Sequence, residues 1–131
     1  MKGISPSESE LKNLLAHYQN GRYDVAEKLA KMITQQFPEH QFSWTVLGAV
    51  LSQTGTLIDS LTALQKSVEL APQDAKAHCN LGITLQELGR LDEAKASYTQ
   101  AIALKPDYAE AHYNLGITLT QLGRFNEAEA A

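Results

Sequence analysis

The chain has 131 residues, of which 44% are hydrophobic and 20% charged, so it can bury a core and is expected to fold. Its net charge of -4 offers no basic surface to phosphate groups, which excludes nucleic acid as the main partner and disfavours anionic membranes. The longest apolar run, Val46 to Leu51, is too short to span a bilayer and no apolar signal core follows Met1, so we expect a cytoplasmic protein.

The first predicted helix begins near Ser7, because Ser5-Pro6-Ser7-Glu8 reads as a capping box with proline at the first helical position. Further along the chain, glycine and proline each recur every 34 residues. They stand at Gly21, Gly55, Gly89 and Gly123, and at Pro38, Pro72 and Pro106. The segments between them, such as 75–88 and 91–105, have helical length and spacing. Each unit is therefore predicted to be two helices joined by a tight turn at glycine and followed by a turn at proline.

A direct internal repeat supports this division. When the sequence is shifted by 34 residues, the stretch 75–97 matches 109–131 at 15 of 23 positions. A fixed period of this length is typical of a solenoid of stacked units. The first unit is the most divergent, because Asn13-Leu14 stands where later units have Leu-Gly.

These residues resemble the tetratricopeptide repeat, whose 34-residue pattern has conserved places for tryptophan, Leu-Gly, small residues, an aromatic residue and proline. The second unit carries Trp44, Leu47-Gly48, Gly55, Leu64 and Pro72. The third carries Leu81-Gly82, Gly89, Ala94, Tyr98, Ala101 and Pro106, with His78 in place of tryptophan.

The resemblance implies an all-α fold, an alpha-alpha superhelix that forms a right-handed solenoid of helix-turn-helix repeats. We expect one domain over 1–131 with repeats at about 7–40, 41–74, 75–108 and 109–131, the last one incomplete. Small residues are expected where paired helices approach closely, with Gly48, Gly82 and Gly116 facing Ser60, Ala94 and Ala128.

The incomplete fourth unit leaves the apolar side of its first helix without a predicted cover. Two explanations stay open. The chain is either part of a longer protein, or its C-terminal end is covered by a second copy in a head-to-tail or swapped homo-oligomer.

In the family, first helices line a concave groove, and the resemblance implies partner-binding residues at matching positions. They are Phe42, Thr45, Ala49, Gln53, Cys79, Asn80, Ile83, Gln86, Tyr113, Asn114, Ile117 and Gln121. Their mixture of apolar and amide groups suits a protein or an extended peptide. Family members that grip acidic tails use lysine and asparagine where this chain has Leu11, Leu15, Thr45 and Ile83, so that mode is not expected.

Asn80 and Asn114 occupy one repeat position, and they resemble an asparagine ladder in the repeat region of bacterial O-linked N-acetylglucosamine transferase-like proteins. The alternative is that they only make an inner face polar. His78 and His112 stand at the tryptophan position and are interpreted as packing residues, because one zinc ion cannot reach equivalent places on neighbouring helices. Cys79 is interpreted as a small groove residue with no adjacent base.

No catalytic, metal or cofactor motif is evident in the sequence. We therefore predict a non-enzymatic scaffold that presents a concave groove for protein-protein interaction. Two alternatives remain: a substrate-recruiting fragment of a larger transferase, and a module that self-assembles.

Overall fold

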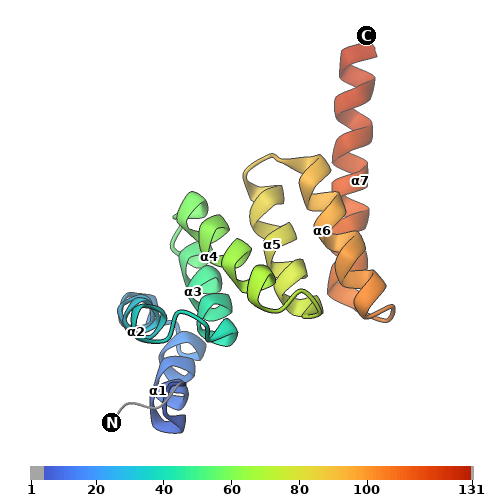
Figure 1. Cartoon of the computed structure of the whole chain (residues 1–131). Helices are drawn as coiled ribbons and strands as arrows, with labels where there is room; N and C mark the ends of the chain where they lie inside the picture. The colour runs from blue at the N-terminus through green and yellow to red at the C-terminus, as the bar shows by residue number, and fades with distance from the viewer. Residues whose placement is uncertain (1–4, 131) are drawn as a thin grey trace. The chain divides into compact units, whose positions relative to one another are not determined.

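The computed structural model describes residues 5–130, with side chains described as far as Arg124, and this part of the chain is all-α. It contains seven helices that pack as consecutive helix-turn-helix pairs, which confirms the predicted fold class (Figure 1). The chain divides into two compact units, Met1–Ala71 and Pro72–Ala131, called here the N-terminal and C-terminal units.

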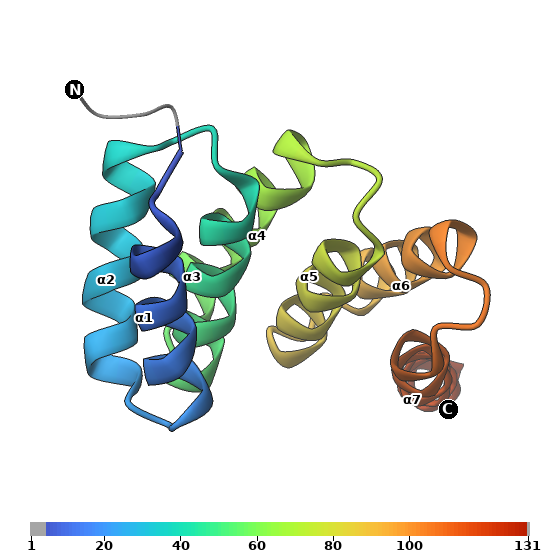
Figure 2. The ribbon, with the colours of Figure 1, turned by 90° about the horizontal axis from the view of Figure 1, so that it is seen from below.

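The N-terminal unit holds two helical hairpins. Its helices are α1 (Glu8–Gln19), α2 (Tyr23–Gln36), α3 (Gln41–Gln53) and α4 (Leu57–Leu70). Helix α1 pairs with α2 and α3 with α4, while α2 also packs against α3 (Figure 2). Apolar residues that recur at helical spacing meet in one buried cluster. It includes Leu14, Ala26, Ala30, Ile33, Phe37, Val46, Leu47, Val50, Leu51 and Ala63.

A capping box begins α1, but two residues later than the sequence prediction placed it. Ser7 is the N-cap; its Oγ accepts from the backbone N–H of Glu10, and the Glu10 carboxylate accepts from the backbone N–H of Ser7, both at 3.1 Å. Pro6 therefore precedes the cap and does not occupy the first helical position. Both Ser5 and Ser7 have glutamate three residues later, Glu8 and Glu10, so the sequence pattern alone did not decide between the two caps.

The C-terminal unit contains α5 (Ala75–Glu87), α6 (Leu91–Leu104) and α7 (Ala109–Ala130). Asp74 caps α5 through its carboxylate, which accepts from the backbone N–H of Lys76 at 3.0 Å. Helix α6 packs against both α5 and α7, and α5 also contacts α7. Two first helices of successive repeats are thus brought together in this unit.

Glycine ends the first helix of each complete hairpin, as predicted. Gly21, Gly55 and Gly89 have φ of 74°, 83° and 78°, in the left-handed region that favours glycine. At Gly89 the turn is closed by two backbone bonds, from Gly89 N–H to Gln86 O at 3.0 Å and from Arg90 N–H to Leu85 O at 2.9 Å.

The predicted turn at Gly123 is wrong. Helix α7 runs without a break from Ala109 to Ala130, although Leu122-Gly123-Arg124 repeats the turn sequence Leu88-Gly89-Arg90. A turn is stable only when the helix after it packs back on the helix before it. Helix α6 supplies that packing for the turn at Gly89, whereas in the described residues no helix follows α7 to pack back on it. The helical hydrogen bonds therefore continue through Gly123.

Replacing Gly89 and Gly123 separately with alanine should have opposite effects on stability. Nothing lies within 4 Å of a Cβ at either position, so only the backbone conformation differs. Gly89→Ala forces alanine into the left-handed region and should cost about 1 kcal/mol, whereas Gly123→Ala should stabilise the helix by about 1 kcal/mol. Urea unfolding of both variants measures the two effects, and a destabilised Gly123→Ala variant would indicate a turn at residue 123.

Candidate functional site

Glycine lets paired helices approach closely in two hairpins. A Cβ on Gly82 would lie 2.7 to 3.0 Å from the ring of Tyr98, which is fully buried. A Cβ on Gly48 would collide with the side chain of Leu64. The side chains that fill these two places, Tyr98 and Leu64, lie four residues after the predicted facing residues Ala94 and Ser60. Ser60 does face Gly48, as predicted, since its Oγ donates to the carbonyl oxygen of Gly48 at 2.7 Å.

In the first hairpin the large and the small side chain are exchanged at these two repeat positions. Thirty-four residues before Gly48 and Leu64 stand Leu14 and Ala30, and both are fully buried in the same cluster. The large side chain is therefore on the first helix here and on the second helix in the later hairpins. Comparing sizes at 34-residue spacing would have revealed this exchange from the sequence.

The residues at the tryptophan position of the repeat, Trp44, His78 and His112, each contact the carbonyl oxygen of a proline six residues earlier. The Trp44 Nε1–H donates to the carbonyl oxygen of Pro38 at 2.8 Å. The Nε2 atoms of His78 and His112 lie 2.9 and 2.7 Å from the carbonyl oxygens of Pro72 and Pro106. A carbonyl only accepts, so both Nε2 atoms carry the proton. Each histidine thus contacts its proline turn through Nε2, but His78 is only half-buried and His112 is exposed, so packing in the core is not confirmed. In the described residues no group of three potential metal ligands forms.

In the N-terminal unit the predicted groove residues differ in accessibility. Phe42 is 41% exposed, Gln53 is exposed and Ala49 is half-buried. Thr45 was predicted wrongly as a contact residue, since it is 6% exposed. Its hydroxyl lies 2.6 Å from that of Ser67 on α4, so the side chain joins two helices and is not free to bind a partner.

In the C-terminal unit, α5 and α7 bring together most of the predicted residues. Asn80, Ile83, Gln86, Asn114 and Ile117 are half-buried, and Gln121 is exposed. The Gln86 amide donates to the Gln121 side-chain oxygen at 3.4 Å, and the Tyr98 hydroxyl donates to Gln86 at 2.7 Å. These bonds fix the amide of Gln86 on the surface shared by α5 and α7.

Cys79, the remaining predicted residue of α5, is buried, which corrects its assignment to the groove. Its thiol lies 3.7 Å from a carboxylate oxygen of Glu110 on α7. Burial, and then the Glu110 charge, raise the pKa of the thiol to about 11. A thiol with this pKa stays protonated near neutral pH, so it is not poised as a nucleophile. Tyr113, at the same repeat position on α7, is 71% exposed.

The C-terminal unit should lose stability between about pH 9 and 11. Burial raises the pKa of Cys79 from its usual value near 9 to about 11 and also raises the pKa of Tyr98 and Tyr108. The folded state therefore holds protons that the unfolded state releases, and the free energy of unfolding falls as pH rises. Urea unfolding at several pH values measures the fall, which Cys79→Ala should reduce. Equal slopes for both proteins would contradict the assignment.

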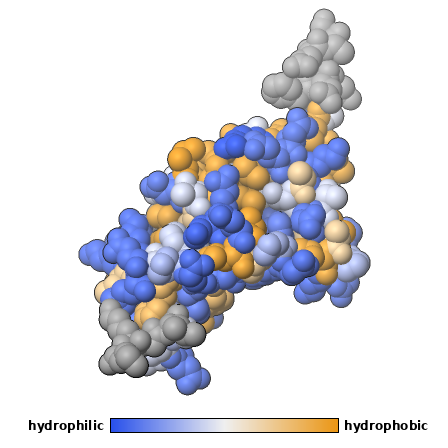
Figure 3. All heavy atoms as spheres, viewed as in Figure 1, coloured by the Kyte–Doolittle hydropathy of each residue, from blue (hydrophilic) through white to orange (hydrophobic). Residues whose placement is uncertain are grey.

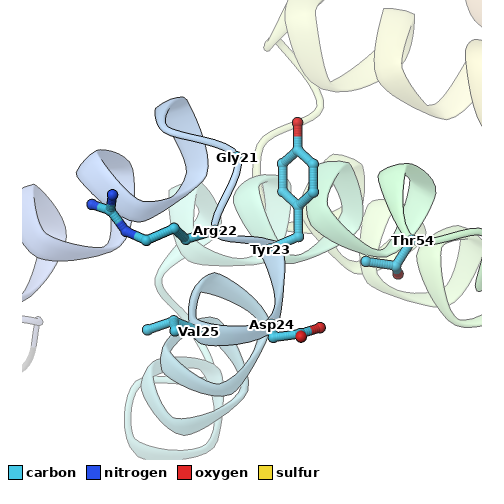
Figure 4. Close-up of a pocket in the computed structure, with 6 residues that line it drawn as sticks. All are labelled: Gly21, Arg22, Tyr23, Asp24, Val25 and Thr54. Carbon is cyan, nitrogen blue, oxygen red and sulfur yellow. The ribbon is translucent and has the colours of Figure 1, made fainter.

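One surface pocket lies beside the turn between α1 and α2 and reaches Thr54, which follows the predicted groove residue Gln53. It encloses about 460 Å³ and is lined by Gly21, Arg22, Tyr23, Asp24, Val25 and Thr54 (Figure 4). The Arg22 Nε–H donates to His17 Nδ1 at 2.8 Å, so part of its hydrogen-bonding capacity is used within the turn. The pocket presents no pair of a nucleophile and a base.

Hydrophilic and hydrophobic residues are interspersed on the face shown in Figure 3. None of the helices in the described part of the chain combines the length and the apolar character that crossing a membrane requires.

Three models of known families match successive parts of the chain. Models described as "Tetratricopeptide repeat" match residues 11–75 and 63–96, and a model described as "TPR repeat" matches residues 85–123. Together they run from the first helix of the N-terminal unit into α7. Searching curated protein sequences gave no match.

Three solved structures are examples of proteins with a similar fold. The first tetratricopeptide domain of Spaghetti (RPAP3), bound to the HSP90 peptide SRMEEVD, has a TM-score of 0.86 at 20% identity, covering 93% of this chain and 99% of that chain. A mutant of the O-GlcNAc transferase of Thermobaculum terrenum has a TM-score of 0.76 at 27% identity, covering 87% of this chain but 23% of that one. A mutant of MamA has a TM-score of 0.75 at 28% identity, covering 91% and 69%.

The paired helices, their glycine turns and the recurrent ring-to-proline contact thus define a helical repeat module. The chain is a tetratricopeptide repeat protein.

Proposed function

We propose that the chain is a protein-binding scaffold whose C-terminal unit holds an extended peptide segment along α5 and α7, the first helices of its repeats. The observation that carries this proposal is the pair Asn80 and Asn114 on the contacting helices α5 and α7. Both side chains are half-buried, and neither amide hydrogen-bonds within the part of the chain that the structure describes. Each amide can therefore donate to and accept from the backbone of an extended ligand.

Neighbouring side chains fit the same ligand. Ile83 and Ile117 lie three residues after the two asparagines, on nearly the same side of each helix, and offer apolar contacts between the polar ones. A backbone-directed site with shallow apolar contacts suits an extended segment better than a folded surface. The RPAP3 domain, which shares the fold over 99% of its length, holds a peptide, and this supports the same general use here.

The test is to capture proteins from a lysate with the wild-type chain and with the Asn80→Ala/Asn114→Ala double variant. The variant should lose specific ligands while its circular dichroism and unfolding curve stay nearly unchanged, because the two amides make no described hydrogen bond. A peptide identified in this way should then bind the variant at least tenfold more weakly, a loss of about 1.4 kcal/mol.

A matched control is the Thr99→Ala/Gln100→Ala variant, which removes two exposed polar side chains from α6. It should capture the same proteins as the wild type. If the asparagine variant also captures the wild-type set with unchanged affinity, the surface of α5 and α7 is not the binding site.

A second candidate is that the repeats recruit substrates for a larger transferase. The 27% identity to the Thermobaculum terrenum O-GlcNAc transferase, over 87% of this chain, favours it. This chain spans 23% of the length of that protein. Determining whether the native gene encodes a catalytic domain next to these repeats tests this candidate, and a gene product without one would rule it out.

A further inference from the structure

The pocket beside the turn between α1 and α2 offers hydrogen-bond acceptors to a ligand. Asp24 is exposed and makes no hydrogen bond or ion pair with the residues that the structure describes. The Thr54 hydroxyl donates to the carbonyl oxygen of Leu51 at 3.1 Å, so toward the pocket it can only accept. Figure 4 shows the Asp24 carboxylate and the Thr54 side chain extending toward the same side of the turn.

The ring of Tyr23 forms an aromatic wall of this pocket. It is half-buried, and its centroid lies 5.9 Å from the centroid of the Tyr18 ring at an interplanar angle of 56°. This contact holds the Tyr23 ring in place beside the pocket. Because the face of an aromatic ring is electron-rich, it attracts cations. A ligand that fits Tyr23, Asp24 and Thr54 together therefore carries a positive charge and hydrogen-bond donors.

The charges around the pocket favour a cation over an anion. Arg22 lines the same pocket, but Figure 4 shows its guanidinium extending to the opposite side of the turn, where Nε–H donates to His17 Nδ1 at 2.8 Å. Helix α3 ends at Thr54 with unpaired carbonyl groups and the negative end of its dipole. The start of α2 is positive, but Asp24 in its first turn already supplies the matching negative charge.

We propose that this pocket binds a terminal ammonium or guanidinium group, carried by a lysine or arginine side chain of a partner protein or by a free small amine. The cation pairs with Asp24, donates to the Thr54 hydroxyl and lies against the ring of Tyr23. The pocket volume of about 460 Å³ is sufficient for such a group. The pocket belongs to the N-terminal unit, so this proposal does not depend on the groove proposed on α5 and α7.

The test titrates the whole chain, labelled with 15N, with n-butylammonium and n-butylguanidinium chloride, and with butyrate as an anion of similar size. The two cations should shift the amide resonances of residues 22–25 and Thr54. Added salt should reduce these shifts, because it screens the attraction between the charges. Butyrate should leave the resonances unchanged. The absence of a shift with both cations, or an equal shift with butyrate, would overturn the proposal.

Two variants locate the cation within the pocket. Asp24→Asn keeps the shape of the side chain without its charge and should bind both cations about fivefold more weakly. Tyr23→Leu introduces the residue type of Leu57 and Leu91 in the later hairpins, and should bind about threefold more weakly. Asp92→Asn is the matched control, since Asp92 occupies the position of Asp24 in the third hairpin, and it should bind as the wild type does. Unchanged binding by a folded Asp24→Asn variant would contradict the assignment.

Peptides decide which molecule carries the cation. Terminally blocked pentapeptides with lysine, arginine or glutamate between alanines are added to the same labelled chain. Tighter binding of the lysine or arginine peptide than of the free cations would support a protein partner, and equal binding would support a free amine. A glutamate peptide that binds as tightly as the other two would overturn the cation proposal.

Discussion

Gly82→Leu should lower the free energy of unfolding by about 3 kcal/mol, at the upper end of the range for overpacked cores. The new side chain would begin inside the space of the Tyr98 ring, whose carbon atoms lie 2.7 to 3.0 Å from the Cβ position. Tyr98 cannot move aside freely, because it is fully buried and its hydroxyl donates to Gln86 at 2.7 Å. Thermal unfolding should therefore show a melting temperature roughly 10 °C lower.

Gly116→Leu is the matched control for this prediction. It makes the same substitution in the same sequence context, Asn-Leu-Gly-Ile-Thr-Leu, where nothing described lies within 4 Å of the new Cβ. Because leucine favours a helix over glycine by roughly 1 kcal/mol, this variant should be as stable as the wild type or more so. Equal losses in the two variants would mean that the loss does not come from the contact with Tyr98.

The fold was largely predictable because the determinants of each hairpin are local and recur every 34 residues. Glycine in the left-handed region at Gly21, Gly55 and Gly89 ends each first helix, and the following apolar spacing defines the second. The exception at Gly123 shows the limit of this reasoning. Its sequence matches the turn at Gly89, but the choice between turn and helix depends on packing by a second helix, which a local pattern does not encode.

The candidate site was predicted less completely than the fold. Asn80, Ile83, Asn114 and Ile117 lie at least partly exposed on α5 and α7, as their repeat positions implied. Whether they bind a partner stays a prediction. Thr45 and Cys79, which share one repeat position, were predicted to contact a partner but are buried. The accessibility of this position depends on the neighbouring helices and not on the residue type. The hydroxyl of Ser67 and the carboxylate of Glu110 come from α4 and α7, 22 and 31 residues away in sequence.

In the first hairpin the large side chain, Leu14, lies on the first helix and the small one, Ala30, on the second. The second prediction of a large effect on stability therefore concerns Leu14 in the N-terminal unit. Leu14→Ala should cost about 3 kcal/mol, within the range measured for buried leucine in other proteins. Leu14 is fully buried in the cluster with Ala26, Ala30 and Ile33. Small residues at 26 and 30 cannot extend into the vacated space, so a cavity should remain. Urea unfolding measures the loss.

Leu15→Ala is the control, since Leu15 is the adjacent leucine of α1 and only half-buried at the edge of the same cluster. Its removal should cost about 1 kcal/mol, because less apolar surface is withdrawn from water. A loss at Leu14 no larger than the loss at Leu15 would contradict the proposed role of Leu14.

A double variant tests the size exchange itself. Leu14→Gly combined with Ala30→Leu gives the first hairpin the arrangement that Gly48 and Leu64 have in the second. If the two positions face one another as their equivalents do, Ala30→Leu should restore part of the stability that Leu14→Gly removes. The two substitutions would then be non-additive, as expected for residues in contact. Additive losses would show that the hairpins pack differently, and that the divergent sequence of the first repeat reflects a different helix contact instead of an exchange of sizes.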